Sequence, residues 1–213
     1  MYQTILNDAS FYRVLLRFDD DLAEQARREG CGCGGKLHSA RYPRKPRGAP
    51  EELQEEYSRR RSFCCAEENC RRRTTPASFR FLSRRVYVAA VVVLITALGH
   101  GATPARVKQL RVMVGVSRHT LERWRQWWLE EFPRSSFWRW ASGQMATPVD
   151  EHRLPLSLLE SFRKLGAEER TIDLLHFILP LTTASSCKKS EGCAGRRGCR
   201  LRRPAGLGSV SER

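Results

Sequence analysis

The stretches Cys31-Gly-Cys33-Gly-Gly-Lys-Leu-His38 and Phe63-Cys64-Cys65-Ala-Glu-Glu-Asn-Cys70 decide the fold of the first part of this 213-residue chain. Two pairs of cysteines that a loop brings together can supply four thiolates to one tetrahedral zinc ion. The glycines after Cys33 allow a tight turn that directs both thiolates at one point. The spacing, Cys-x-Cys followed by Cys-x4-Cys, predicts a structural zinc site in a small β zinc ribbon over residues 30–83.

We expect four cysteines to be the zinc ligands, namely Cys31, Cys33, Cys65 and Cys70. If residues 57–65 are extended, Phe63 and Cys65 lie on one face of a strand and Cys64 lies on the other. Cys64 is the first substitute ligand and otherwise a small buried hydrophobic residue. His38 is the second substitute and otherwise an exposed loop residue. A structural zinc site is closed and does no chemistry, so the sequence around the cysteines must explain the function.

Basic residues outnumber acidic ones by 38 to 23, which gives a net charge of +15 and a pI near 10.1. Only six of the 38 are lysine, and an arginine guanidinium can bind a phosphate or a guanine edge with two parallel hydrogen bonds. A GC-rich genome would enrich arginine evenly, whereas here arginine runs lie beside the cysteines at 59–61, 71–73 and 84–85. The composition therefore favours double-stranded DNA as the partner, with Arg71, Arg72 and Arg73 among the candidate contacts.

The loop between the two cysteine stretches reads Tyr42-Pro-Arg-Lys-Pro-Arg-Gly-Ala-Pro50. Its prolines exclude a helix and favour an extended, polyproline-like arm. Such an arm would carry Arg44, Lys45 and Arg47 along a phosphate backbone or into a minor groove. An ordinary surface linker is an equally good interpretation of the same residues.

Two helices are expected around this module. Over residues 8–28 apolar residues recur at helical spacing up to Gly30, which predicts an amphipathic helix in an N-terminal segment of residues 1–29. The run Val86–Leu98 has Thr96 as its only polar residue, but its thirteen residues are too few for a membrane span of about 20. This run is therefore expected to be a buried core helix. Because the polar N-terminus is not a signal peptide, we expect a cytoplasmic protein that does not bind membranes.

Residues 103–132 match the twenty-residue helix-turn-helix pattern. Thr103-Pro104 is a cap followed by proline at the first helical position, Gly115 lies at the turn, and Ser117 caps a second helix that ends near Phe132. The departure is Arg111, where the pattern prefers a small residue. The resemblance implies DNA contacts from Ser117, Arg118, His119, Glu122, Arg123, Gln126 and Arg106. A structural helical hairpin with a solvated outer face is the alternative.

The C-terminal part is expected to add two short helices, Leu156–Leu165 and Glu168–Leu179, within residues 133–185, with Pro180 ending the second. The five tryptophans are expected to pack in the core or between helices, with a base-stacking platform as the weaker alternative. Residues 186–213 are basic and poor in apolar residues, which predicts a disordered tail. Its cysteines, Cys187, Cys193 and Cys199, have no clear fourth ligand for a second metal site.

A longer resemblance covers roughly residues 10–180. The runs Cys33-Gly-Gly-Lys-Leu-His38, Cys70-Arg-Arg-Arg-Thr-Thr-Pro-Ala-Ser-Phe-Arg-Phe81 and Ser117-Arg-His-Thr-Leu-Glu-Arg-Trp124 are similar to small bacterial proteins encoded beside transposases in mobile elements. This resemblance implies a mainly α protein with a zinc ribbon and, over residues 84–132, a core helix plus a helix-turn-helix. It also implies a transposase-associated accessory protein or regulator. A transposase or a second copy of the chain is then a candidate partner besides DNA.

The sequence shows no catalytic constellation. A transposase needs three separated carboxylates on a ribonuclease-H-like sheet, whereas Asp150, Glu151 and Asp173 lie in turn or helix contexts. The three consecutive aspartates at 19–21 diverge by about 100° per residue on a helix and cannot converge on one metal. We therefore expect a DNA-binding protein without enzymatic activity. The alternatives are a transcriptional regulator unrelated to transposition and a protein–protein adaptor for a transposase.

Overall fold

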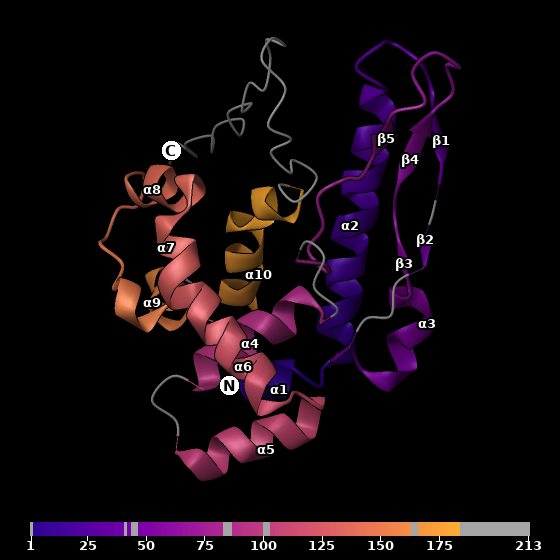
Figure 1. Ribbon diagram of the computed structural model, residues 1–213. Helices are drawn as coiled ribbons and strands as arrows, with labels where there is room; N and C mark the ends of the chain where they lie inside the picture. The colour runs from indigo at the N-terminus through magenta and orange to yellow at the C-terminus, as the bar shows by residue number, and fades with distance from the viewer. Residues whose placement is uncertain are drawn as a thin grey trace, which may run out of the picture.

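The computed structural model describes residues 2–40, 42–43, 47–82, 87–99, 103–162 and 166–183. These residues are mostly helical. Three short strands, β1 (Leu37–Ser39), β4 (Phe63–Cys65) and β5 (Arg73–Thr74), form an antiparallel sheet in the order β1-β4-β5 (Figure 1). The expected mainly α fold with a small β component is confirmed. Arg44, Lys45 and the predicted disordered tail with its three cysteines lie outside the described residues.

The helical elements, in chain order, are α1 (Tyr2–Ile5), α2 (Ala9–Glu29), η1 (Glu51–Leu53), α3 (Gln54–Tyr57), α4 (Ala89–Gly99), α5 (Pro104–Val114), α6 (Arg118–Gln126), the π-helix η2 (Trp127–Glu131), α7 (Phe132–Arg134), α8 (Ser136–Ser142), η3 (Glu151–Arg153), α9 (Leu156–Ser161), α10 (Ala167–Phe177) and η4 (Leu179–Thr182). The strands are β1 (Leu37–Ser39), β2 (Tyr42–Pro43), β3 (Arg59–Arg60), β4 (Phe63–Cys65) and β5 (Arg73–Thr74). β2 and β3 form a second, two-stranded antiparallel sheet.

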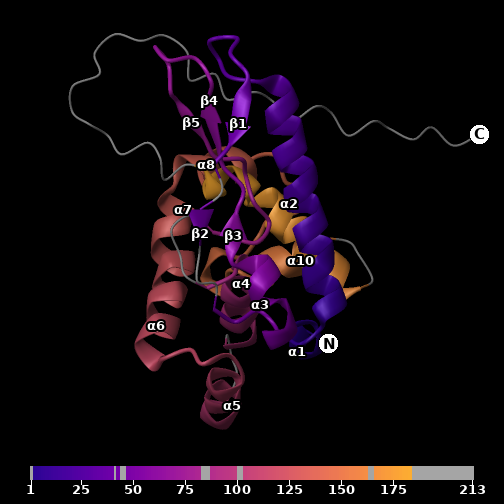
Figure 2. The ribbon, with the colours of Figure 1, turned by 90° about the vertical axis from the view of Figure 1, so that its right-hand side faces the viewer.

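α2 is a long helix that forms one side of the molecule, with the sheet beside it (Figure 2). Asp8 caps this helix by accepting a hydrogen bond from Ser10 N, and the helix ends at Gly30, whose φ of 72° favours glycine. These ends agree with the helix expected over residues 8–28. Its first half packs in the main apolar core, whereas Ala23 and Ala26 in its second half pack against the sheet.

α4 lies at the centre of the main core, with α1, α5, α6, α9 and α10 packed around it (Figure 1). Its residues from Ala89 to Ala97 are all buried, and the hydroxyl of Thr96 donates a hydrogen bond to Val92 O at 2.7 Å. A helix that is buried on all sides is apolar all round, which explains the continuous apolar run in the sequence. Among the described residues, no helix is long and apolar enough to cross a bilayer.

A buried ion pair joins α2 to the segment that leads from the sheet to α4. Asp19 Oδ2 lies 2.7 Å from Arg80 Nε, and Arg80 is only 1% exposed. The Asp19 carboxylate also accepts hydrogen bonds from Ser78 Oγ and Phe79 N, both at 2.6 Å. Arg80 donates further bonds to two backbone carbonyls in the segment 56–59. Buried charges persist only when they are paired and hydrogen-bonded, so this junction fixes α2 against residues 78–80.

The arginine run at 59–61 is also partly structural. Arg60 is buried and donates to Phe81 O at 3.4 Å and Pro76 O at 3.1 Å. Arg61 forms an ion pair with Asp20 at 2.5 Å. Arg59 is therefore the one arginine of this run that is exposed and has no acidic partner among the described residues. Counting charges along the sequence overstates the basic surface that this run provides.

The two predicted C-terminal helices are present, each shorter than expected, and both pack in the main core. α9 and α10 correspond to the predicted helices from 156 and 168, and residues 163–165 lie outside the described part of the chain. Trp124, Trp128 and Trp138 are buried, as expected for core residues. Trp140 is 57% exposed, so the expectation of core or interhelical packing is wrong for this residue.

Candidate metal centre and nucleic-acid interface

Two backbone turns present the cysteines. In the first, Gly34 N donates to Cys31 O at 2.8 Å and Cys31 N donates to Gly35 O at 3.0 Å, while Gly34 has a φ of 85°. In the second, Cys70 N and Arg71 N both donate to Glu67 O at 3.0 Å, and Arg71 has a positive φ of 42°. Both turns follow from short local sequences, as the spacing of the cysteines indicates.

The sheet brings the two turns together. β1 and β4 pair with Leu37 opposite Cys65, and the ladder continues through a hydrogen bond from Ala66 N to Lys36 O at 2.9 Å. Cys65 N donates to Arg72 O at 3.0 Å, which ties β4 to the chain after the second turn. Cysteines more than thirty positions apart in the sequence therefore meet at one end of the sheet.

Gly35 makes this approach sterically feasible. A Cβ on Gly35 would lie 2.8 Å from Cys65 Sγ and 2.5 Å from Glu67 Cγ. Both distances are far shorter than a van der Waals contact, so any side chain here would push the two turns apart. The glycine is required by the close packing of the turns and not by a positive φ.

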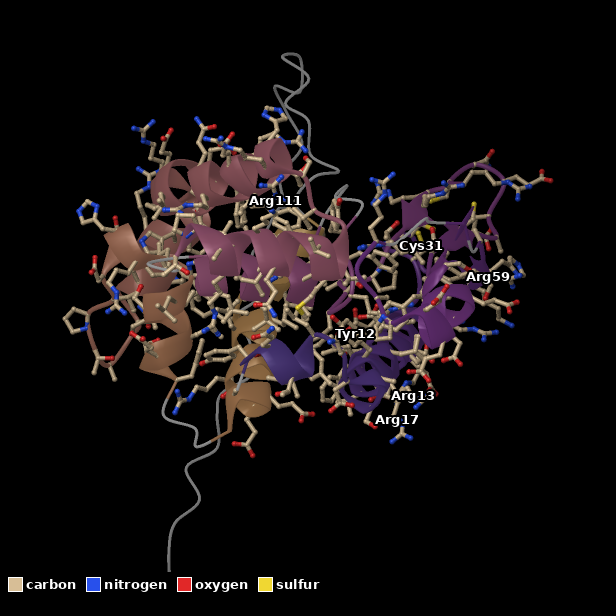
Figure 3. All side chains as sticks on the ribbon, turned by 90° about the horizontal axis from the view of Figure 1, so that it is seen from below. Tyr12, Arg13, Arg17, Cys31, Arg59 and Arg111 are labelled. Atoms are coloured by element: carbon tan, nitrogen blue, oxygen red, sulfur yellow. The ribbon has the colours of Figure 1, made fainter. Side chains whose placement is uncertain are left out.

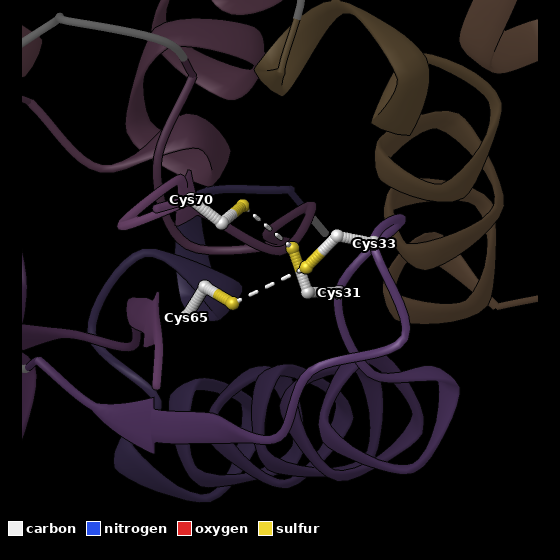
Figure 4. Close-up of side chains that lie close together, drawn as sticks. All are labelled: Cys31, Cys33, Cys65 and Cys70. Atoms are coloured by element: carbon white, nitrogen blue, oxygen red, sulfur yellow. Dashed lines mark hydrogen bonds between the residues drawn. The ribbon is translucent and has the colours of Figure 1, made fainter. Parts of the chain in front are cut away.

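The sulfur atoms of Cys31, Cys33, Cys65 and Cys70 all lie within 4.8 Å of one another (Figure 4). Cys31 Sγ is 3.7 Å from Cys70 Sγ, and Cys33 Sγ is 3.5 Å from Cys65 Sγ. A tetrahedral site with Zn–S bonds of about 2.3 Å would place sulfurs about 3.8 Å apart. A disulfide would need about 2.05 Å. The spacing therefore fits four thiolates around one metal ion such as zinc.

The two substitute ligands lie outside this cluster. Cys64 points to the other face of β4, where it is partly exposed and its Sγ lies 3.5 Å from Arg71 O. His38 is exposed on β1. The alternation along β4 separates Cys64 from Cys65 as the sequence predicted. The expectation that Cys64 is a buried hydrophobic residue is wrong, because it is on the open face of the sheet.

The environment of the sulfurs is uneven. Hydrogen bonds from the backbone and side chain of Cys33 lower the pKa of Cys31 to about 7, whereas burial raises the pKa of Cys65 to about 12. Cys31 and Cys65 pack with Ala23, Leu37 and Phe63 in a small apolar cluster against α2, while Cys33 is exposed. Four thiolates cannot accumulate in this space without a cation, so a divalent ion would supply the charge that lets the remaining thiols ionise.

The second candidate site is the helix pair α5–α6. Thr103 caps α5 by accepting from Arg106 N at 3.4 Å, with Pro104 as its first residue. Gly115 ends α5 in the left-handed conformation, with φ 63° and ψ 24°. Ser117 then caps α6 by accepting from Thr120 N at 3.2 Å. The predicted caps and turn are confirmed, and α6 continues through η2 into α7.

The core holds this pair through its turn. Tyr87 Oη donates to Gly115 O at 3.2 Å, and its ring packs edge-on against Trp124 at a centroid distance of 4.9 Å. Leu110, Val116 and Leu121 are buried in the main core, which contains α4. Arg111 is partly buried, and its Nε has no hydrogen-bond partner among the described residues (Figure 3). The unusual residue of the pattern therefore lies at the packed side of α5.

The predicted DNA contacts of this pair lie on the surface. All seven are exposed, namely Arg106, Ser117, Arg118, His119, Glu122, Arg123 and Gln126. Arg118 Nε lies 2.8 Å from Glu122 Oε1, and Gln126 Nε2 donates to Glu130 Oε2 at 3.2 Å. Arg123 has no such partner among the described residues. Of the two exposed arginines of α6 predicted to contact DNA, Arg123 is therefore the one that can contact a base or phosphate without first breaking an ion pair.

The remaining basic candidates are dispersed. Arg71, Arg72 and Arg73 are exposed beside the cysteine turns, with Arg71 3.9 Å from Glu68. Arg47 is exposed, but its carbonyl accepts from Val88 N at 3.1 Å, and the next residue, Gly48, packs against α4. At this point the Tyr42–Pro50 loop is therefore anchored to the core and is not a free arm.

The end of the sheet that carries the cysteine cluster and α5 lie at opposite ends of the molecule (Figures 1 and 2). The cysteine turns are at the end of the sheet beyond β1 and β4, and α5 is at the other end. One short duplex cannot lie flat on both ends at once. The basic residues near the cysteines and those of α6 therefore form separate surfaces.

The acidic residues considered for catalysis have local structural roles. Asp150 Oδ1 accepts from His152 N at 3.0 Å at the start of η3, and Glu151 Oε1 accepts from Trp138 Nε1 at 2.5 Å. Asp173 is partly buried on α10.

No protein-family model, curated protein or solved structure matches the chain.

Proposed function

We propose that this protein is a zinc-dependent DNA-binding protein of a mobile genetic element, an accessory protein or regulator that acts beside a transposase. The observation that carries the proposal is the free outer face of α6. That helix begins at an exposed cap, Ser117, and presents Arg118, His119 and Arg123 to solvent. A helix of this kind can enter a major groove and contact base edges through its first turns.

The zinc part of the proposal rests on the four sulfurs. Cys31, Cys33, Cys65 and Cys70 would hold one ion, and the predicted module of residues 30–83 would then be a zinc ribbon. The apolar cluster beneath them has five buried residues, two of which are cysteines. A module with so small a core generally needs a metal or disulfides to remain folded. The zinc would act structurally and carry out no reaction.

The DNA part rests on how rigidly α6 is presented. Tyr87 and Trp124 fix the turn and the inner face of the helix, so its outer side chains need little reordering on binding. Basic residues on α5 and α6, together with a net charge of +15, favour a polyanion. The role in a mobile element is proposed from the resemblance of the sequence motifs to proteins encoded beside transposases.

Selection of duplexes from a random library, followed by Arg123→Ala, tests the proposal. We expect one preferred sequence, and loss of a bidentate base contact should weaken binding to it by about 1–3 kcal/mol, or roughly 5- to 150-fold. Arg139→Ala is the matched control. Arg139 is an exposed arginine on α8, so this substitution removes the same charge outside α6. Equal, salt-sensitive losses in both variants would show a non-specific basic surface and refute sequence reading by α6.

A protein–protein adaptor is the second candidate. Val112 on α5 is 78% exposed and Trp140 on α8 is 57% exposed, so each offers apolar surface that a partner protein could cover. An adaptor would bind the neighbouring transposase and would not enrich any duplex from the library. Val112→Asp would then reduce transposase binding, whereas Arg123→Ala would leave it unchanged.

A further inference from the structure

A groove with a volume of about 480 Å³ runs between the second half of α2 and the sheet. Polar residues line much of it, including Asp20, Glu24, Arg27, Arg28, Arg61 and Ser62. The helix that lines this groove, α2, forms one flank of the molecule, and α6 forms the other flank (Figure 2). The groove is therefore separate from the proposed DNA-reading face and does not include the four clustered cysteines.

Ser62 is an unusual residue in this lining. It is 1% exposed, and its Oγ has no hydrogen-bond partner among the described residues. Its backbone is used, because Ser62 O accepts from Ala40 N at 2.8 Å. A buried hydroxyl without a partner is costly, so one that lines a groove indicates an acceptor that enters from the groove.

The charges around Ser62 favour an anion as this acceptor. Arg61 Nε lies 2.7 Å from Asp20 Oδ1, so these two residues neutralise each other. Arg27 and Arg28 are exposed and have no acidic partner among the described residues, which leaves two guanidinium groups against Glu24. Arginines in the last turn of a helix also complement its dipole. Charge alone therefore does not indicate a site, whereas charge beside an unpaired buried hydroxyl does.

We propose that this groove binds a phosphate group. The Arg27 guanidinium donates to two of its oxygens, the Ser62 hydroxyl donates to a third, and Arg28 adds positive charge at the rim. Arginine and hydroxyl donors together are the usual partners of phosphate oxygens. The phosphate belongs either to a nucleic-acid backbone or to a free phosphoester, and both sources present the same oxygens. This site goes beyond the proposed function and does not depend on base reading by α6.

The test uses the purified full-length protein and three probes, namely inorganic phosphate, a nucleoside monophosphate and a random-sequence DNA duplex. Binding is measured by titration with detection of backbone amide shifts, where we expect the amides of residues 61–63 to respond. Arg27→Ala and Ser62→Ala should each weaken binding of the responding probe at least about tenfold, because each removes a hydrogen bond to a charged group. Arg13→Ala is the control, since Arg13 is exposed at the outer edge of the same helix (Figure 3) and is not part of the groove.

Ser62→Ala separates binding from folding. Removing an unpaired hydroxyl should leave the melting temperature unchanged or raise it, while phosphate binding falls. The inference is overturned if no probe binds at millimolar concentration, if Ser62→Ala binds as tightly as wild type, or if Arg13→Ala weakens binding as much as Arg27→Ala. A response to the small phosphates alone assigns the groove to a free phosphoester, and a response to the duplex assigns it to a DNA backbone. Arg123→Ala reports on α6 separately, so either proposal can fail while the other stands.

Discussion

Replacing Asp19 with alanine is the most direct test of how the two ends of this molecule are held together. The substitution removes the carboxylate that pairs with Arg80 and accepts from Ser78 Oγ and Phe79 N. Removing one partner of a buried pair costs about 3–5 kcal/mol, because the other charge stays buried and unpaired. Arg80 would keep its bonds to two carbonyls and its contacts with the Tyr57 and Phe81 rings. We therefore expect a loss near the lower limit, about 3 kcal/mol.

The assays are urea unfolding, which gives the free energy of unfolding, and thermal unfolding, both followed by circular dichroism at saturating zinc for all variants. A loss of about 3 kcal/mol should lower the melting temperature by roughly 6–12 °C in a chain of this size. Asp21→Ala is the control, because Asp21 is exposed on the same helix and has no partner among the described residues. It should change the free energy of unfolding by less than about 0.5 kcal/mol.

A double variant tests the physical reason. Asp19→Ala combined with Arg80→Met removes both charges and fills the space with an apolar side chain, which should restore part of the lost stability. If Asp19→Ala unfolds within 1 kcal/mol of Asp21→Ala, the pair is not a structural junction. If the double variant is less stable than Asp19→Ala alone, the loss does not come from an unpaired buried charge.

Three further predictions concern the cysteine cluster. Cys65→Ser should abolish the retention of one zinc per chain after gel filtration, whereas Cys64→Ser should retain it, because Cys64 lies on the opposite face of β4. Gly35→Ala should weaken zinc binding and destabilise the fold by about 1–3 kcal/mol, since its Cβ would overlap Cys65 Sγ; competition titration and urea unfolding measure the two effects. Zinc affinity should rise with pH, because the thiols lose protons when they bind the metal. The slope of log affinity against pH should fall by about one unit as the pH rises through 7, because above that pH Cys31 is already ionised without metal. A pH-independent affinity between pH 6 and 8 would contradict thiolate ligation.

Features that depend on a few neighbouring residues were predictable from the sequence. The caps at Thr103 and Ser117 and the turn at Gly115 each follow from local backbone chemistry. The choice of Cys65 over Cys64 followed from the alternation of side chains along one strand. In both cases the relevant partners lie within a few residues or in a repeating geometry.

Features that depend on distant partners were not predictable in the same way. The arginine run at 59–61 looked like a basic surface, but Arg60 is buried and Arg61 pairs with an aspartate more than forty positions away. A signal for Asp19 did exist in the sequence, because it lies four residues after Leu15 and four before Ala23, on the apolar stripe of α2. The identity of its partner, Arg80, depends on tertiary packing that periodicity does not encode.

The separation of the two apolar clusters determines what zinc could control. The main cluster surrounds α4 and includes the inner faces of α5 and α6, whereas the cysteine cluster shares no buried residue with it. Zinc bound at the cysteines would therefore act on α6 indirectly, through α2, the Asp19–Arg80 junction and the segments before and after the sheet that bond to the main core. Under the proposed function, removing zinc should disorder the cysteine turns and the adjacent groove before it alters α6. Zinc removal would then weaken DNA binding mainly through lost contacts between the cysteine end of the protein and the DNA backbone, whereas base reading by α6 would change little.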